Sequence, residues 1–178
     1  MTNTSDRLLL PRGAQLSPCG AYRYRLWRRW DTSTLPVTFI MLNPSTADAE
    51  KDDPTIRKCC KFARRWGYGG IEVVNLFAWR ATSPRALYRS PHPIGEHNDD
   101  AIVDRSRASA LVVCAWGNHG KLLQRSHDVL KLLREHSYVA HALRVTRQNQ
   151  PGHPLYLRDD IVPFLWDIRN SNWSSPDG

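Results

Sequence analysis

Four mainly apolar runs divide the chain into a regular pattern. They occupy residues 37–42, 71–77, 110–116 and 138–145. Short apolar runs without polar alternation are typical of strands that are covered on both faces. Between them, apolar residues recur at helical spacing over 54–66 and 98–109, and from the turn at 117–120 through Glu135. Strands that alternate with helices predict an α/β fold: a three-layer α/β/α sandwich around a short, mostly parallel four-stranded sheet.

Two further segments carry a pattern of their own. Residues 22–30 alternate aromatic or apolar side chains with arginines, which predicts a strand with one basic face. That face either meets phosphates or belongs to a solvated edge strand that its charges protect. Before the helix at 54–66, Asp53 suits the N-cap position and Pro54 the first helical position.

The rest of the chain is assigned to loops and tails. Residues 81–95 are rich in proline, serine and arginine and predict a long surface loop, whereas 159–166 predict a short helix. No repeat or linker divides the chain, so residues 1–178 are predicted to form a single domain. Residues 1–18 and 168–178 are expected to be flexible tails.

The charge balance adds a partner to this picture. The chain has 25 Lys and Arg residues against 17 Asp and Glu residues, a formal net charge of +8 and a pI near 9.7. A positive surface of this kind is expected of a protein that binds nucleic acid.

Hydropathy and cysteine content indicate the compartment. The chain contains no run of 18 apolar residues, which a membrane span would need, and residues 1–12 do not have the pattern of a secretory signal. We therefore expect a cytoplasmic protein. The four cysteines, Cys19, Cys59, Cys60 and Cys114, form no C-x-x-C pair. They are interpreted as free thiols, and we expect no metal site and no cofactor.

Candidate chemistry gathers where the predicted strands end. The stretch 39–48 changes within two residues from an apolar strand to small polar residues at Asn43. Asn75 ends the second run, and a polar turn follows Trp116. Parallel strands place their carboxyl ends at one edge of the sheet, where open α/β folds bind ligands. We therefore expect these side chains to lie close together, with His153 as a fourth contributor.

Four sequence motifs resemble the uracil-DNA glycosylase superfamily, in the family's order. They are Asn43-Pro44-Ser45, the strand 73–77 with Arg80 after it, the Trp116-Gly117 turn that continues to His119, and the His153-Pro154 pair with apolar residues after it. The sequence looks closest to a bacterial and phage branch built around N-P-S-T-A-D. The resemblance implies a monofunctional DNA glycosylase, which hydrolyses the N-glycosidic bond of a flipped base and leaves an abasic site.

Departures from the family pattern bear on the substrate. The first motif lacks the aspartate and the tyrosine of the uracil-specific branch, and Ser45, Thr46 and Ala47 are small. The tyrosine would exclude 5-substituted pyrimidines, so we expect a modified pyrimidine. One candidate is the glucosylated hydroxymethylcytosine of phage DNA, which would make this protein an antiviral defence enzyme. The His-Pro motif also lacks its usual second proline.

The resemblance assigns roles to particular residues. Asn43 would orient the attacking water, with Asp48 as the preferred carboxylate because Asp53 is explained as a helix cap; His153 would stabilise the departing base. No lysine occurs in the four motifs, which argues against a Schiff base; Lys121 is the nearest. The remaining site residues are Pro44, Ser45, Thr46, Asn75, Phe77, Trp79, Trp116 and His119 around the base, Arg80 and Arg85 on phosphate, and Leu155, Tyr156 or Leu157 as an apolar wedge in DNA. Burial in the core is the safer interpretation for Phe77 and Trp79. Core packing of 155–157 and a solvated loop surface for the two arginines are the alternatives.

Two other functions fit the same residues. A non-catalytic nucleic-acid-binding module would keep the basic surface and tolerate loss of Asn43. A hydrolase of free nucleotides or nucleosides would need no basic surface, so its DNA binding would be weak and insensitive to salt. In the favoured interpretation the partner is DNA, the protein is a monomer, and it does not bind a membrane.

Overall fold

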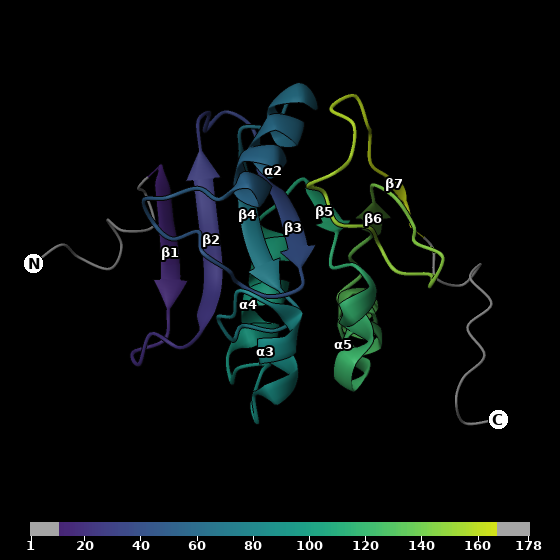
Figure 1. Ribbon diagram of the computed structural model, residues 1–178. Coiled ribbons are helices and arrows are strands. Elements are labelled where there is room, and N and C mark those ends of the chain that lie inside the picture. The colour runs from purple at the N-terminus through teal and green to yellow at the C-terminus, as the bar shows by residue number, and fades with distance from the viewer. Residues whose placement is uncertain (1–10, 167–178) are drawn as a thin grey trace, which may run out of the picture.

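The computed structural model describes residues 11–166, and within them seven strands form one sheet (Figure 1). The strand order across the sheet is β1-β2-β4-β3-β5-β6-β7. The strands are β1 (Arg12–Leu16), β2 (Arg23–Arg29), β3 (Val37–Met41), β4 (Gly70–Asn75), β5 (Leu111–Cys114), β6 (Ala140–Ala142) and β7 (Phe164–Leu165).

The four central strands are parallel and the outer three are antiparallel. Strand β3 pairs in parallel with both β4 and β5, and β5 pairs in parallel with β6. Strands β2 and β1 extend the sheet beyond β4, and β7 extends it beyond β6. The predicted α/β class is confirmed, whereas the predicted four-stranded sheet is wrong. The apolar runs identify only strands covered on both faces, and the added strands are basic, polar or only two residues long.

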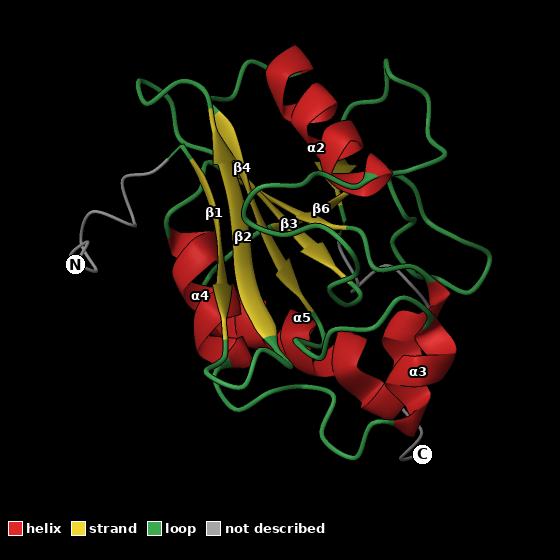
Figure 2. Cartoon of the chain, turned by 60° about the vertical axis from the view of Figure 1, so that its left-hand side comes forward, coloured by secondary structure: helices red, strands yellow, loops and turns green. Residues whose placement is uncertain are grey.

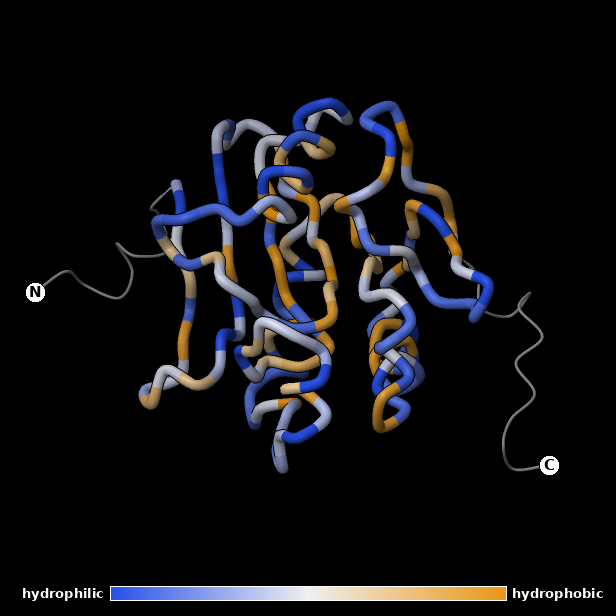
Figure 3. Tube along the Cα trace, viewed as in Figure 1, coloured by the Kyte–Doolittle hydropathy of each residue, from blue (hydrophilic) through white to orange (hydrophobic). Residues whose placement is uncertain are grey.

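Helices cover both faces of the sheet. Helix α2 (Pro54–Arg65) lies against one face, and α4 (Asn98–Arg107) and α5 (Arg125–Glu135) against the other (Figure 2). Phe39 of β3 packs in the apolar cluster under α2, and the next residue, Ile40, packs in the cluster under α4 and α5. This alternation makes the central strands the most continuous apolar segments of the described chain (Figure 3).

Helix α2 begins as its sequence predicts. Asp53 is the N-cap, and its Oδ1 accepts a hydrogen bond of 2.9 Å from the Ile56 N–H. Pro54 occupies the first turn, where its missing N–H leaves no donor unsatisfied. The cap also fixes Asp53 and Pro54 at the end of the helix that faces the carboxyl edge of β3.

Strand β2 is not an edge strand, so the interpretation of its basic face as a solvated edge is wrong. It pairs with β1 on one side and β4 on the other. Arg23, Arg25 and Arg28 are all buried, with exposed fractions of 3%, 8% and 6%. Arg25 donates two hydrogen bonds, of 2.7 and 2.6 Å, to the carboxylate of Glu72, which is buried on β4. Arg28 is paired with Asp52 at 2.7 Å.

Several segments differ locally from expectation. Residues 81–95 contain helix α3 (Pro84–Arg89), whose N-cap is Ser83. No helix forms near 159–166, which instead contributes β7. Strand β1 comes from the stretch expected to be a tail, because its backbone pairs with β2. The rest of the predicted tails, at 1–10 and 168–178, lies outside the described residues. All four cysteines are free thiols, as predicted, and no helix in residues 11–166 is long and apolar enough to cross a membrane.

Candidate active site

A pocket of about 600 Å³ lies at the carboxyl edge of the parallel strands. Its walls come from the loop after β3, the first residues of α2, the end of β4, the 81–84 loop, the turn after Trp116 and the segment around His153. Met41 is in register with Asn75, so the polar residues that follow β3 and end β4 are neighbours. The pocket therefore contains many of the residues that the sequence places at strand ends: Asn43, Ser45, Thr46, Asn75, Trp116, His119, His153, Leu155 and Tyr156.

Asn43 is held in one orientation by its own amide. Its Nδ2 donates to the carbonyl oxygens of Pro44 at 3.0 Å and Ala81 at 2.8 Å. Two carbonyl acceptors fix the assignment of the amide nitrogen, so Oδ1 is left as an acceptor. No donor of the described residues hydrogen-bonds to Oδ1. Asn43 can accordingly accept a hydrogen bond from a bound water or ligand.

Two buried donors in the pocket wall lack a partner. They are Nδ2 of Asn75 and Nε of Arg23, and their residues are only 1% and 3% exposed. The Asn75 backbone is held in place, because the side chain of Asn98 donates to its carbonyl oxygen at 2.8 Å. Native proteins rarely leave buried donors unpaired, and a bound water or ligand is one explanation for an exception. A group with acceptor oxygens is the complement of this wall.

Arg23 carries a buried positive charge that no described carboxylate pairs. Its Nη1 donates to the Ala47 carbonyl oxygen at 2.5 Å, which is the one hydrogen bond of this side chain within the described residues. Burial lowers the pKa of Arg23 to about 10, and the nearby charge of Asp53 partly opposes this. The guanidinium stays protonated at neutral pH. A bound anion, or a group that becomes anionic, would offset the desolvation of this charge.

His153 lies at the rim with a defined tautomer. Its Nδ1 accepts a hydrogen bond of 3.2 Å from the Leu155 N–H, so in the neutral ring the proton sits on Nε2. Desolvation lowers the pKa of His153, and the charge of Asp53 acts in the opposite direction. His153 is therefore a neutral Nε2–H donor at physiological pH.

The two candidate aspartates lie in different places from those expected. Asp48 does not line the pocket; its Oδ1 accepts from the Glu50 and Lys51 N–H groups and closes a turn. These two hydrogen bonds lower the pKa of Asp48. Asp53 does line the pocket. Its Oδ1 is engaged in the cap, and its Oδ2 forms no hydrogen bond or ion pair with the described residues. A carboxylate has two oxygens, so capping and a role at the site are compatible.

Trp116 forms a rigid part of the wall. It is 2% exposed, and its Nε1 donates to Oε1 of the buried Gln150 at 2.9 Å. Gly117 follows with a positive φ of 72°, which turns the chain sharply out of the sheet. Gly120 lies so close to Trp116 that a Cβ atom on Gly120 would be 2.2 Å from the indole. On the rim, His119 Nδ1 lies 3.2 Å from the Tyr88 hydroxyl, which can form a hydrogen bond with it.

The three candidate wedge residues have different surroundings. Tyr156 is 90% exposed at the edge of the pocket, and Leu155 also lines it. Leu157 instead packs against the apolar cluster under α2. Tyr156 is thus the side chain that projects furthest from the protein next to the pocket.

Several other predicted residues lie outside the pocket. Phe77 is fully buried in the core under α4 and α5, and Trp79 packs against the same core and against Tyr22. Pro44 is buried beside the pocket, where its carbonyl oxygen accepts from Ala81. Arg80 is exposed and donates to the Gly20 carbonyl oxygen, and Arg85 is exposed on α3. Neither aromatic ring is in a position to stack on a base in this pocket.

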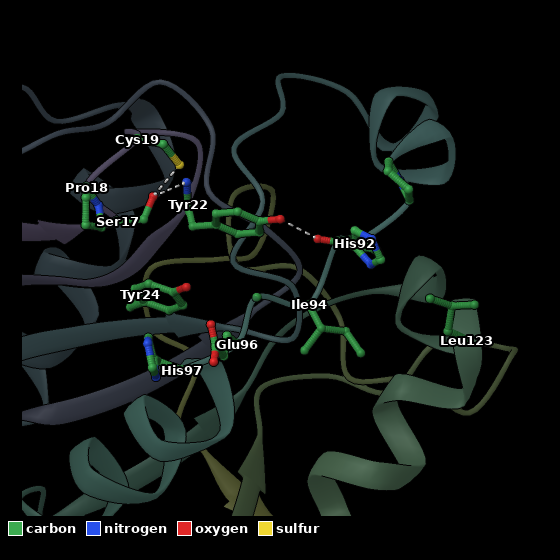
Figure 4. Close-up of a pocket in the computed structure, with 13 residues that line it drawn as sticks. Ser17, Pro18, Cys19, Tyr22, Tyr24, His92, Ile94, Glu96, His97 and Leu123 are labelled. Carbon is green, nitrogen blue, oxygen red and sulfur yellow. Dashed lines mark hydrogen bonds between the residues drawn. The ribbon is translucent and has the colours of Figure 1, made fainter.

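A second cavity has walls of a different kind. It has a volume of about 620 Å³ and is lined mainly by aromatic and apolar groups, including Tyr22, Tyr24, Ile94 and His97 (Figure 4). Its tyrosine hydroxyl is engaged, since Tyr22 donates to the His92 carbonyl oxygen at 2.9 Å. None of the predicted site residues lines it, and within residues 11–166 no group of three His, Cys, Asp or Glu side chains could hold a metal ion.

Residues 23–155 match the model of DUF1643, a family described as a protein of unknown function. The chain belongs to the DUF1643 family. The matched segment contains every residue that lines the candidate site except Tyr156. No curated protein and no solved structure matches the chain significantly.

Sequence reasoning missed two site residues of this DUF1643 domain. Arg23 was placed in a basic strand but not at the site, because the antiparallel pairing of β2 with β4 is what carries it there. Asp53 was visible as a helix cap, and the cap position beside the loop after β3 was the signal that could have placed it at the pocket.

Proposed function

We propose that this DUF1643 protein is a DNA glycosylase that removes a flipped, modified pyrimidine by hydrolysis. The observation that carries the proposal is the pair of unpartnered buried donors, Arg23 Nε and Asn75 Nδ2, in a pocket at the carboxyl edge of the parallel strands. A pyrimidine base has carbonyl oxygens that accept from such donors. The same oxygens gain negative charge when the base leaves, so the donors would bind the transition state better than the substrate.

The reaction breaks one bond and forms one. Water adds its oxygen to C1′ of the sugar while the bond between C1′ and the base nitrogen breaks, and the bonding electrons leave with the base. One proton of the water ends on the departing base, and the sugar keeps a hydroxyl. The charge of Arg23, the amide of Asn75 and the Nε2–H of His153 all favour the anionic base.

The developing sugar cation needs groups with negative charge or lone pairs. Asn43 Oδ1 can accept a hydrogen bond from the attacking water, although an amide is not a base. The free oxygen of Asp53 supplies the negative charge that stabilises the cation and takes up the water proton, which then passes to the departing base. Asp53 replaces Asp48 in this role, because Asp48 closes a turn outside the pocket.

The size and lining of the pocket favour a modified base. A volume of about 600 Å³ is more than one pyrimidine ring fills. Ser45, Thr46 and Ser83 add hydroxyl groups to the wall, and these suit a substituent rich in hydroxyls. A glucosylated hydroxymethylcytosine of phage DNA meets both conditions, which would give the protein a role in antiviral defence in the cytoplasm.

Base flipping requires help from the protein surface. Removing a base from the stack costs a few kcal/mol, roughly the energy that an inserted side chain and pocket contacts can offset. Tyr156, which is 90% exposed beside the pocket, is the candidate wedge. The four central parallel strands, with the pocket at their carboxyl edge, also support the resemblance to uracil-DNA glycosylases.

Base release from a panel of DNAs tests the proposal. Purified protein is incubated with uracil-containing, mismatched, hydroxymethylated and glucosylated phage DNA, and abasic sites are scored by alkaline cleavage. We expect cleavage of the glucosylated DNA, which Asn43→Ala and Asn75→Ala abolish. Arg134→Ala, at an exposed position of α5, serves as the control that keeps activity.

The outcomes separate the competing functions. DNA binding without abasic sites on any substrate would indicate a non-catalytic module. Release of bases from free nucleosides but not from DNA would indicate a nucleoside hydrolase. Release of uracil alone would refute the modified-base assignment.

A further inference from the structure

A second, strongly basic hollow lies alongside α2. It has a volume of about 520 Å³ and is lined by six cationic side chains and one carboxylate. We call it the α2 cleft; its cationic residues are Arg12, Arg28, Arg29, Arg57, Lys61 and Arg64. A concentration of positive charge in a hollow strengthens the local field and attracts polyanions.

Only part of this charge is neutralised within the protein. The one carboxylate, Asp52, is paired with Arg12 at 3.3 Å and with Arg28 at 2.7 Å. Lys61 is paired with Asp159 outside the cleft. Arg29, Arg57 and Arg64 have no ion-pair partner among residues 11–166. These three side chains are therefore available for an external anion.

Details of the three arginines suit phosphate groups. Nη1 of Arg29 is buried and has no hydrogen-bond partner, while its Nη2 donates to the Thr34 carbonyl oxygen at 3.0 Å. Arg64 stacks over the indole of Trp30, with 3.9 Å from its Cζ to the ring centroid. A stacked guanidinium keeps its N–H edge free, and a planar arginine binds phosphate oxygens in pairs.

The α2 cleft and the candidate active site meet at the start of α2. Asp52 lines the cleft, and the next two residues, Asp53 and Pro54, line the active-site pocket. The helix has 12 residues and contains no acidic side chain. At about 1.5 Å per residue it is about 18 Å long, and at about 3.4 Å per nucleotide this length matches about five phosphates of one DNA strand.

We propose that the α2 cleft binds the phosphodiester backbone of the DNA strand that flanks the flipped base. The choice of DNA as the polyanion rests on the proposed function. Arg57 and Arg64 contact phosphates and position the strand, so they add affinity without reading sequence. Arg29 adds positive charge deeper in the cleft.

The test measures DNA binding against salt. A fluorescently labelled short duplex is titrated with the wild type and with Arg57→Ala/Arg64→Ala over a series of NaCl concentrations. Each lost phosphate contact lowers the slope of log K against log salt by about 0.9, so the double variant should lose about 1.8 from the slope. The matched control is Lys131→Ala/Arg134→Ala on α5, across the sheet from α2, and it should keep the wild-type slope.

The outcomes distinguish this proposal from the proposed function. A wild-type slope for Arg57→Ala/Arg64→Ala overturns the α2 cleft as a DNA site. So does binding of the wild type to phosphatidylserine vesicles but not to the duplex. If the slope changes as expected and no base is released from any DNA, the cleft stands and the glycosylase activity fails. Both exposed arginines leave the core intact, and thermal unfolding checks this directly.

Discussion

Replacing Arg23 with methionine should leave the protein at least as stable as the wild type while it abolishes base release. Burial lowers the pKa of Arg23 to about 10, and this shift reflects the free-energy cost of burying the charge. At about 1.4 kcal/mol for each pKa unit, the folded state gives up about 3 kcal/mol. Methionine removes this cost but leaves the Ala47 carbonyl oxygen without its donor, a loss of about 1–3 kcal/mol. The net change is between about 0 and 2 kcal/mol of stabilisation.

Arg25 provides the matched control, two residues further along the same strand. It is also buried, but it makes a two-point ion pair with Glu72. Arg25→Met leaves that carboxylate buried, with only Arg105 nearby at 3.8 Å. Removing one partner of a buried pair destabilises by about 3–5 kcal/mol. The same substitution should thus have opposite effects on stability at two neighbouring positions.

Urea unfolding of both variants, together with base release, measures the two effects. Loss of one donor to the leaving base lowers kcat by about 100- to 1000-fold, so Arg23→Met should be folded and inactive. Arg25→Met should be unstable but active in proportion to its folded fraction. The reasoning is refuted if Arg23→Met unfolds as easily as Arg25→Met, or if folded Arg23→Met releases base at the wild-type rate.

Three further expectations follow from the site. Asp53→Asn should keep the helix cap, since asparagine caps as well as aspartate, yet it should lower kcat by about 100-fold or more. The control, Asp48→Asn, keeps its turn and should keep the wild-type kcat. Equal losses of kcat in both variants would contradict the assignment. The lowered pKa of His153 keeps its ring neutral at physiological pH. Base release should therefore fall only as the pH drops through the pKa of His153 in the folded protein, where protonation breaks the Leu155 hydrogen bond. The same protonation lowers the stability of the fold, because the unfolded state binds the proton more tightly. A rate profile of the wild type and of His153→Gln, with a ring ¹⁵N NMR titration, measures this, and an Nδ1–H tautomer would refute it. Tyr156→Ala should reduce base release from duplex DNA without a change in stability, and full activity on duplex DNA would exclude it as the wedge.

Local patterns in the sequence determined much of this protein. The four central strands follow from mainly apolar runs, because a strand between two helical layers is covered on both faces and holds few polar residues. The start of α2 follows from Asp53 and Pro54, since a cap and its first turn involve only adjacent residues. Parallel strands share one carboxyl edge, so the sequence alone predicted that Asn43 and Asn75 are neighbours in a pocket.

Tertiary structure decided which charged groups reach that pocket. Arg23 is brought there by the antiparallel pairing of β2 with β4, two strands separated by β3 and α2 in the chain. Strand β4 ends at Asn75, so the side chain of Phe77 packs in the core and does not line the pocket. The choice of Asp53 over Asp48 depends on the path of the loop between β3 and α2. Such outcomes depend on pairings between distant segments, whose free energies no local pattern encodes.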